Sequence, residues 1–183
     1  MFHEMTIAGV KRQLPLFPVT DDLYIGAFIM FGDVEITVES AKELLKKVPE
    51  FDIMCTAEAK SIPLIHEMAR QAGHNDYVIA RKGVKVYMKD IISTEVNSIT
   101  TANTQKLYIG GDEADKMRGK RVLIVDDVIS TGESLRAIEA LVKEAGGNIV
   151  GKAAVLAEGD AVNRDDIIFL EKLPLFNPDG SVK

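Results

Sequence analysis

The chain has 183 residues, a formal net charge of −6 and 46% hydrophobic residues, a balance that fits one domain with a sizeable core. The strongly apolar stretch at 25–31 is far short of the roughly 18 residues that a membrane span needs, and the first residues lack the pattern of a secretory signal. The acidic balance argues against nucleic-acid binding, and a single cysteine excludes an internal disulfide and a multi-thiolate metal site. We therefore expect a cytoplasmic protein with neither a membrane nor a nucleic-acid partner.

The pattern of apolar residues predicts an α/β fold in which helices flank a mainly parallel sheet. Residues 5–36 differ from the rest, because their apolar runs lie among prolines without a helical period, which indicates a small β-rich subdomain. A first helix is predicted with Thr37 as its N-cap and Pro49 as its stop. The remaining elements are predicted as strands at 51–55, 77–80, 121–125, about 149–157 and 167–170, and as helices at about 61–72 and 132–145.

Residues 88–106 carry few large apolar side chains and many Ser, Thr, Asn and Lys residues. Such a segment is too polar for a core and too long for a simple connection. We interpret it as a candidate lid over a site.

The most informative stretch is residues 122–134, VLIVDDVISTGES. Its apolar run is typical of a strand buried on both faces, Asp126 and Asp127 follow at the carboxyl end, and a Ser/Thr/Gly loop opens the next helix. Ligands bind at the carboxyl ends of strands in open α/β sheets, and a helix N-terminus favours anions. Residues 130–134 are therefore candidates to wrap a phosphate, whereas two carboxylates suit sugar hydroxyls or a hydrated Mg²⁺. The segment indicates a site for a phosphorylated sugar.

This segment resembles the phosphoribosyl-pyrophosphate signature of type I phosphoribosyltransferases: an apolar strand, Asp-Asp, two apolar residues and a small-Thr-Gly-x-Ser loop. Residues 56–61, TAEAKS, look like the family's pyrophosphate loop in its adenine and related purine version, and residues 80–85, ARKGVK, look like the basic turn that contacts pyrophosphate. The resemblance covers about residues 37–160. It implies the type I phosphoribosyltransferase fold in a single domain over 1–183, with a core at 37–157, a β-rich hood at 5–36 and about 158–175, and the flexible lid loop at 88–106.

The resemblance also implies a magnesium-dependent enzyme that transfers 5-phosphoribosyl from phosphoribosyl pyrophosphate to a purine base. Because negative charge builds on the leaving pyrophosphate while the anomeric carbon becomes cationic, cations and fixed donors must lie at the pyrophosphate. Asp126 and Asp127 would form the catalytic pair and hold Mg²⁺ directly or through water. The other implied site residues are Ser130, Thr131, Gly132, Glu133 and Ser134 for the 5-phosphate, Ala57, Glu58, Ala59, Lys60, Ser61, Arg81, Lys82 and Lys85 for pyrophosphate, and Phe28, Glu158 and Asp160 for the base.

The residues around position 158 bear on the choice of base. Glu158 and Asp160 are acceptors suited to an exocyclic amine such as adenine N6, whereas enzymes for 6-oxopurines resemble one another in having a lysine near that position. The stretch from Val155 to Asp160 has no lysine, which favours adenine. Lys152 lies upstream in a phase that the sequence leaves open, so hypoxanthine, guanine or xanthine is the alternative.

Three further points stay open at this level. Phe17, Phe28 and Phe31 each fit either a stacking contact with a purine ring or the core. The resemblance implies a homodimer, because members of the family commonly pair. A competing interpretation is a non-catalytic sensor of phosphoribosyl pyrophosphate that regulates transcription or RNA, although the net charge of −6 disfavours the nucleic-acid surface that it needs.

Overall fold

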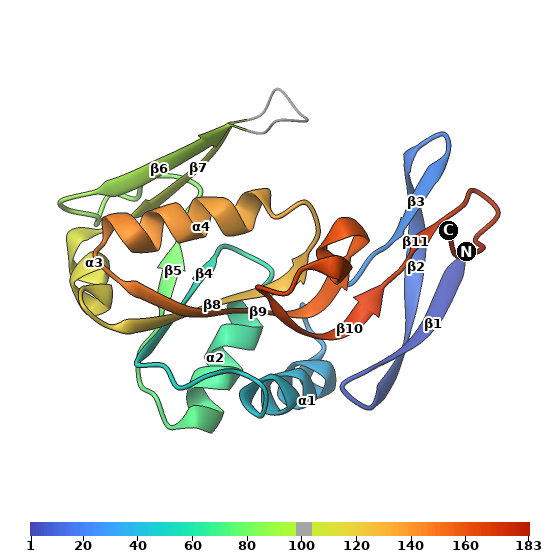
Figure 1. Ribbon diagram of the computed structural model, residues 1–183, viewed down its shortest axis with the longest axis horizontal. Coiled ribbons are helices and arrows are strands. Elements are labelled where there is room, and N and C mark those ends of the chain that lie inside the picture. Colours follow the sequence, from blue (N-terminus) through green and yellow to red (C-terminus); the bar gives the residue numbers. More distant parts are fainter. Residues whose placement is uncertain (98–103) are drawn as a thin grey trace.

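The computed structural model describes residues 1–97 and 104–183, which form a parallel sheet flanked by helices, a separate antiparallel sheet and a two-stranded hairpin (Figure 1). The predicted α/β fold is confirmed. In chain order the elements are β1 (Phe2–Ile7), β2 (Val10–Thr20), β3 (Leu23–Gly26), α1 (Val34–Leu45), β4 (Ile53–Ala57), α2 (Ile62–Ala72), β5 (Val78–Ala80), β6 (Ile92–Asn97), β7 (Thr104–Ile109), α3 (Gly111–Met117), β8 (Arg121–Ile129), α4 (Glu133–Glu144), β9 (Asn148–Glu158), η1 (Gly159–Asn163), β10 (Ile168–Leu173) and β11 (Leu175–Phe176).

The main sheet has five strands in the order β10-β9-β8-β4-β5, and each neighbouring pair is parallel. β8 therefore lies in the middle, and its side chains from Val122 to Val125 are fully buried. α4 covers one face of the sheet, whereas α1 and α2 cover the other (Figure 1). A strand covered on both faces must be apolar throughout, which explains the continuous apolar run that predicts β8.

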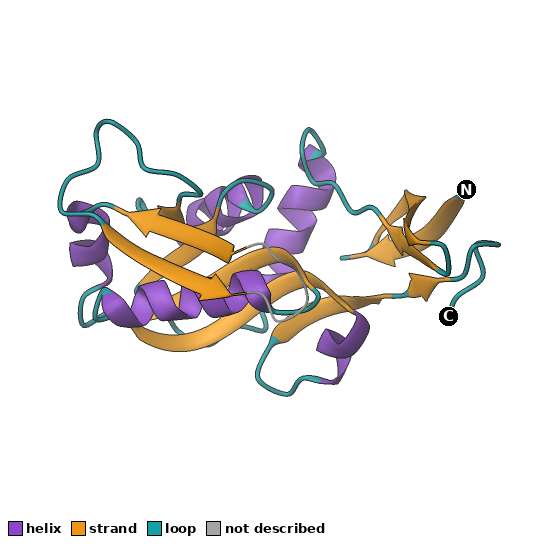
Figure 2. Ribbon diagram, turned by 90° about the horizontal axis from the view of Figure 1, so that it is seen from above, coloured by secondary structure: helices purple, strands orange, loops and turns teal. Residues whose placement is uncertain are grey.

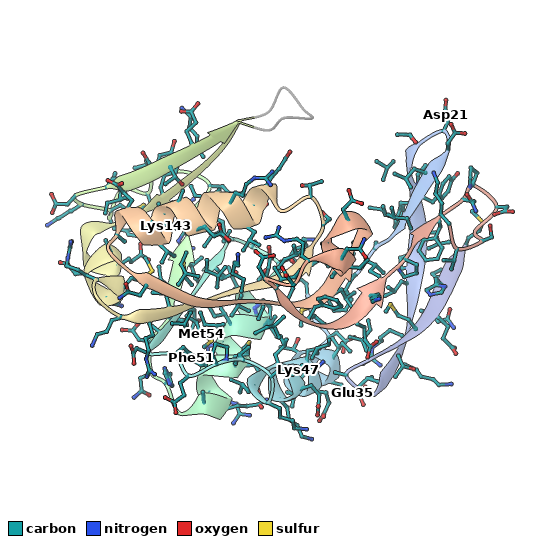
Figure 3. All side chains as sticks on the ribbon, viewed as in Figure 1. Asp21, Glu35, Lys47, Phe51, Met54 and Lys143 are labelled. Atoms are coloured by element: carbon teal, nitrogen blue, oxygen red, sulfur yellow. The ribbon has the colours of Figure 1, made fainter. Side chains whose placement is uncertain are left out.

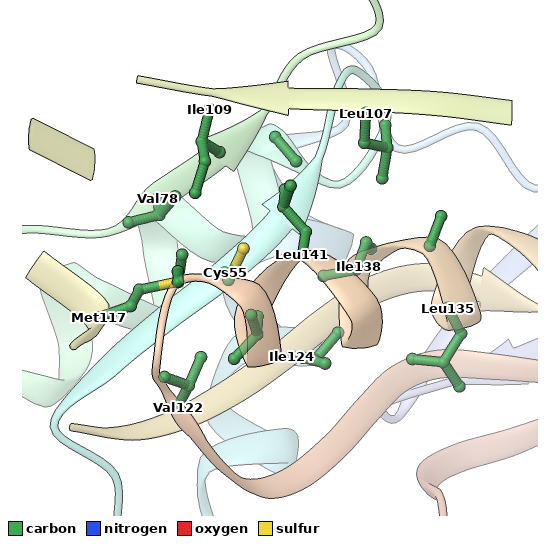
Figure 4. Packing of buried hydrophobic residues seen from close by; sticks show 14 of the residues in the cluster. Cys55, Val78, Leu107, Ile109, Met117, Val122, Ile124, Leu135, Ile138 and Leu141 are labelled. Carbon is green, nitrogen blue, oxygen red and sulfur yellow. The ribbon is translucent and has the colours of Figure 1, made fainter. Parts of the chain in front are cut away.

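Two apolar clusters fill the space on either side of this sheet. On the α4 side, Ile138 and Leu141 pack with Cys55, Val122 and Ile124 from the sheet (Figure 4). On the α1 and α2 side, the second cluster contains side chains of both helices and extends to Phe28, which is 5% exposed. The main sheet is therefore packed with apolar side chains on both faces.

The second sheet has the order β1-β2-β3-β11 and is antiparallel. It stands at one end of the molecule, next to both termini (Figure 2), and we call it the hood sheet. Arg12 on β2 ties it to the start of α1, because its Nε lies 2.7 Å from Asp33 Oδ2 and its Nη2 lies 2.8 Å from Glu35 Oε2.

The structure divides the stretch expected as the second part of the hood, residues 158–175. β10 pairs in parallel with β9 and so belongs to the main sheet, and β11 pairs with β3 in the hood sheet. The hood sheet also begins earlier than residue 5, because β1 starts at Phe2.

Three predicted boundaries are corrected. α1 begins at Val34 and not after Thr37, because Asp33 is its N-cap and accepts a hydrogen bond from the Ile36 amide at 3.2 Å. β4 begins at Ile53 rather than at residue 51. β8 continues past residue 125 to Ile129, since Asp126 and Val128 still pair with β9. The two aspartates are thus residues of the strand itself.

The segment expected as a lid, residues 88–106, contains β6 and the start of β7, which pair as an antiparallel hairpin beside α4 (Figure 1). Thr94 Oγ1 donates to the Ala137 carbonyl at 3.1 Å and links the hairpin to the helix. Residues 98–103 lie outside the described residues. None of the helices in the described part of the chain is long and apolar enough to cross a membrane.

Candidate active site

A cleft of about 440 Å³ lies where β4, β8 and β9 end, between the main sheet and the hood sheet. The carboxyl ends of parallel strands meet at one edge of the sheet, and this edge is the usual ligand site of open α/β folds. The residues that line the cleft are Ile25, Gly26, Ala27, Phe28, Ile29, Ala57, Glu58, Ala59, Lys60, Ser61, Lys82, Leu107, Asp126, Asp127, Val128, Ser130, Ser134, Glu158 and Leu173.

Asp126 and Asp127 lie at the floor of the cleft and share the hydroxyl of Ser61. Ser61 Oγ donates to Asp126 Oδ1 at 2.6 Å, lies 3.3 Å from Asp127 Oδ1 and accepts from the Asp127 amide at 3.0 Å. Burial, followed by the charge of Asp127, raises the pKa of Asp126 well above its usual range, because desolvation and a neighbouring anion both disfavour the ionised form. The pair therefore depends on nearby donors and cations.

Lys60 supplies such a cation. Its Nζ lies 3.1 Å from Asp127 Oδ2, and the lysine side chain is 54% exposed whereas that of Asp127 is 4% exposed. The ammonium group thus lies at the mouth of the cleft, within reach of an anionic ligand as well as of Asp127.

The loop at 57–61 is held to the turn after β5 by Glu58. Glu58 Oε1 accepts from the Lys82 amide at 2.7 Å, and Glu58 Oε2 lies 3.5 Å from Arg81 Nη1. These contacts, led by the Lys82 amide, lower the pKa of Glu58. The peptide bond between Glu58 and Ala59 is cis. A carboxylate that is already bonded to the turn serves to join the two loops rather than to contact an anion.

The loop between β8 and α4 forms a second, smaller pocket of about 40 Å³, which adjoins the cleft at Asp126. Gly132 has φ +75 and precedes the first residue of α4, a left-handed conformation that favours glycine. The N-terminus of α4, whose dipole favours anions, lines this pocket. The pocket is lined by Asp126, Val128, Ile129, Ser130, Thr131, Gly132, Glu133, Ser134 and Leu135.

Glu158 lies on the hood side of the cleft, at the end of β9. Burial raises the pKa of its carboxyl. Phe28 lines the same cleft and is also part of the core, whereas Phe17 and Phe31 are each 53% exposed. The core interpretation therefore holds for Phe28 and is wrong for the other two phenylalanines.

Lys152 points away from this cleft. Its Nζ contacts Glu139 Oε1 at 2.8 Å and also pairs with Asp166, and it does not line the cleft. The open question about its phase is thereby answered, because a lysine held by two carboxylates outside the cleft cannot donate to the 6-oxo group of a purine in the cleft.

The comparisons with known proteins agree with this geometry. A family model described as a phosphoribosyl transferase domain matches residues 37–174. The chain belongs to the phosphoribosyl transferase family. The adenine phosphoribosyltransferase of Thermotoga petrophila is 31% identical over 151 residues, which are 81% of this chain and 85% of that protein.

Two further matches are a relative named for other bases and a solved structure with a similar fold. The hypoxanthine/guanine phosphoribosyltransferase of Methanotorris igneus is 36% identical over 124 residues, which are 67% of this chain and 63% of that protein. A crystal structure of adenine phosphoribosyltransferase from Thermoanaerobacter pseudethanolicus matches with a TM-score of 0.68 at 24% identity, covering 94% of this chain and 96% of that one. The phosphoribosyltransferase fold expected from the signature is confirmed.

Most site residues that the resemblance to phosphoribosyltransferases implies line the cleft or the adjoining pocket, but three do not. Arg81 pairs through its backbone with Tyr108 on β7, and its side chain contacts Glu58. Lys85 lies beyond the cleft and acts on Glu58 by its charge. Asp160 is an exposed residue of η1, so the structure brings Glu158 alone of that pair to the cleft.

Several residues of the transferase cleft are absent from the sequence-based set. Ile25, Gly26 and Ala27 come from β3 and its end, Leu107 comes from β7, and Leu173 comes from the end of β10. They are mostly apolar, and no local pattern distinguishes an apolar residue that lines a cleft from one in a core. Only the packing of segments that are distant in the sequence brings them to the cleft.

Proposed function

We propose that this phosphoribosyltransferase is a magnesium-dependent enzyme that transfers 5-phosphoribosyl from phosphoribosyl pyrophosphate to a purine base, with adenine favoured. The products are a nucleoside monophosphate and pyrophosphate. The observation that carries this proposal is the meeting of three parts in one cleft: the Asp126–Asp127 pair, the loop at 57–61 and the loop that opens α4.

The assignment of substrate parts follows from charge. The pocket at residues 130–134 has amides, hydroxyls and a helix N-terminus, which suit the 5-phosphate. Asp126 and Asp127 accept hydrogen bonds and so suit the ribose hydroxyls next to it. Lys60 and Lys82 are cations that line the cleft and suit the pyrophosphate.

The chemistry requires charge stabilisation and needs no covalent nucleophile. As the bond from the anomeric carbon to pyrophosphate breaks, the ribose carbon becomes cationic and the leaving group gains negative charge. Lys60, Lys82 and the 57–61 loop line the cleft, so the two ammonium groups and the backbone amides would stabilise the leaving group electrostatically. A closed cleft also excludes water, which competes with the base, and we assign this role to the lid loop at 88–106.

The carboxylate pair fits a magnesium ion that is held mainly by the substrate. Mg²⁺ commonly keeps several waters and binds one or two carboxylates together with substrate phosphates. Within the residues that the structure describes, no group of three or more His, Cys, Asp or Glu side chains forms a self-sufficient metal site. Asp126 and Asp127 would hold the ion directly or through water, and the ion would neutralise charge on the leaving pyrophosphate.

Base recognition is assigned to Glu158 and to the hood side of the cleft. An ionised Glu158 accepts from the exocyclic amine of adenine, and Phe28 offers an apolar contact nearby. The position of Lys152 outside the cleft removes a donor that 6-oxopurine recognition would use. Hypoxanthine, guanine or xanthine is the second candidate, because the Methanotorris igneus relative, which is 36% identical, is named for hypoxanthine and guanine.

We also propose a cytoplasmic homodimer. Support for pairing comes from exposed apolar side chains on the turn that follows Lys82, among them Val86 and Tyr87, which are 106% and 67% exposed. Apolar side chains gathered at one exposed turn are typical of an interaction surface. Sedimentation velocity on the purified protein tests the dimer directly, and a monomer at micromolar concentration would refute it.

The deciding experiment measures pyrophosphate release from phosphoribosyl pyrophosphate and Mg²⁺ with adenine, hypoxanthine, guanine and xanthine offered singly. We expect clear turnover with adenine and loss of at least about 100-fold in kcat/KM for Asp127→Asn, since the transition state loses a charged contact. Asp21→Asn is the matched control, because Asp21 lies exposed at the tip of the turn between β2 and β3 (Figure 3).

Three outcomes bear on the proposal. Turnover with a 6-oxopurine alone would refute the role given to Glu158. Binding of phosphoribosyl pyrophosphate without turnover for any base would favour the sensor. Equal activity of Asp127→Asn and Asp21→Asn would refute the site.

A further inference from the structure

Four charged side chains form a network that ends at Gly132, in the loop between β8 and α4. Arg164, directly after η1, donates through Nε to Asp166 Oδ1 at 2.8 Å and through Nη2 to Asp166 Oδ2 at 2.7 Å. Asp166 is shared with Lys152, and Lys152 in turn contacts Glu139 on α4 at 2.8 Å. The network therefore connects α4, β9 and the segment after η1.

The remaining nitrogen of Arg164 faces the loop. Nη1 takes no part in the contacts with Asp166 and lies 2.7 Å from the position that a Cβ on Gly132 would occupy. Gly132 is buried, so the guanidinium group covers its backbone. A residue other than glycine at 132 would therefore collide with Arg164 as well as strain the backbone.

The Asp166 contact fixes the guanidinium in place. A bidentate pair with a carboxylate restricts the arginine to one orientation, and its contacts with Arg164 and Lys152 hold the pKa of Asp166 well below its usual range. The side chain of Arg164 is 29% exposed, so its charge is screened less than that of a free surface arginine. Arg136, in the first turn of α4, lies on the same side, with its Nη1 3.9 Å from the position that a Cβ on Gly132 would occupy.

We propose that Arg164 is a positioning residue for the 5-phosphate: held by Asp166, its guanidinium covers Gly132, keeps the loop in its binding shape and adds positive potential at the α4 N-terminus. This proposal rests on the proposed function, because it assigns the 5-phosphate to that loop. Arg164 acts through Gly132 and through its charge, and the amides of the loop contact the phosphate. It lies on a segment 32 residues beyond the glycine that it covers, which is why the signature does not include it.

The test compares two ligands that use different ends of the cleft. Ribose 5-phosphate carries the 5-phosphate, whereas inorganic pyrophosphate with Mg²⁺ is assigned to the part of the cleft lined by Lys60 and Lys82. Calorimetric titration of Arg164→Gln should show about tenfold weaker binding of ribose 5-phosphate, because the loop loses the group that covers Gly132 and a nearby positive charge. The affinity of this variant for pyrophosphate should stay within about twofold of that of the unmodified protein. Its melting temperature should stay within a few degrees.

Arg118→Gln is the matched control. Arg118 also pairs with a carboxylate, that of Asp115 at 3.0 Å, and also lies over a glycine with positive φ, Gly146. Arg118 does not line the cleft or the phosphate pocket. Binding of both ligands by this variant should therefore match the unmodified protein.

The outcomes separate the two proposals. Unmodified protein that binds neither ligand would overturn the proposed function. Unmodified protein that binds both, with Arg164→Gln losing neither or losing both equally, would overturn the role of Arg164 alone. If Arg164→Gln does not fold, Arg164→Lys decides: it keeps the charge but not the two-point contact, so a loss of about threefold confined to ribose 5-phosphate supports the role, and any other pattern refutes it.

Discussion

Replacing Ser61 with alanine removes a buried hydroxyl that contacts both Asp126 and Asp127, the proposed catalytic pair. Ser61 is 2% exposed, its Oγ donates to Asp126 Oδ1 at 2.6 Å, and it accepts from the Asp127 amide at 3.0 Å. Hydrogen bonds to charged groups contribute roughly 1.5–3 kcal/mol, and a buried acceptor left without its donor is costly. We expect the free energy of unfolding to fall by about 2 kcal/mol, which corresponds to roughly 4–8 °C in the melting temperature of a domain of this size.

The same change should lower activity. Asp126 loses a donor that fixes its orientation, and a loss of roughly 1.5–3 kcal/mol in the transition state corresponds to a decrease of about 10- to 100-fold in kcat/KM. Urea unfolding measures the first quantity, and steady-state turnover of phosphoribosyl pyrophosphate measures the second.

Ser40→Ala is the matched control for this prediction. Ser40 is likewise a buried serine, on α1, and within the described part of the chain its Oγ has no hydrogen-bond partner. Removing a hydroxyl without a partner in a helix should be neutral or slightly stabilising. If Ser61→Ala and Ser40→Ala had the same stability and the same activity, the assignment of Ser61 as the support of the carboxylate pair would be refuted.

Three further predictions concern the body of the protein. Gly147→Ala should cost about 1–3 kcal/mol in urea unfolding, because the new Cβ would lie 2.8 Å from Val122 Cγ2; an unchanged midpoint would contradict this packing. Arg70, followed by other contacts, holds the pKa of Glu67 at about 2, so its ionised form stabilises the fold above the ordinary pKa of 4.5 and this contribution is lost as pH falls from 4.5 towards 2. Melting temperatures of the unmodified protein and of Glu67→Gln should therefore converge over that range, and a constant gap would count against the contact. Burial raises the pKa of Cys55 to about 12, so a thiol reagent should label it only after unfolding, and rapid labelling of the native protein would disprove its burial.

The elements that could be predicted from sequence are those whose determining residues follow one another along the chain. β8, its two aspartates and the loop that opens α4 follow one another along the chain, and their requirements are local: an apolar strand, a glycine with positive φ and a helix N-terminus. Their arrangement in space follows directly from their order in the chain. The loop at 57–61 also follows a strand of the parallel sheet, so it lies at the same carboxyl edge as the two aspartates.

The errors arise where distant residues decide the outcome. Both Asp33 and Thr37 are residue types that cap helices, and Asp33 prevails because its carboxylate also binds Arg12 from β2. Arg81 is predicted at the pyrophosphate, yet it does not line the cleft, because its backbone is bridged to Tyr108 and its side chain contacts Glu58. Ser61 does line the cleft, but its hydrogen bond to Asp126, across 65 positions of chain, is absent from the prediction. Such long-range contacts leave no periodic trace in the sequence.

The hood sheet joins segments that are synthesised far apart in time. β3 is paired on one side with β2 and on the other with β11, and the β11 contact links Tyr24 to Phe176, roughly 150 positions later. Contacts of such long sequence separation form late, because the loop must close before the pairing stabilises it. The edge of β3 that receives β11 therefore stays unpaired until β11 has left the ribosome. Because an unpaired strand edge can pair with another chain, β11 protects the hood sheet against association through this edge.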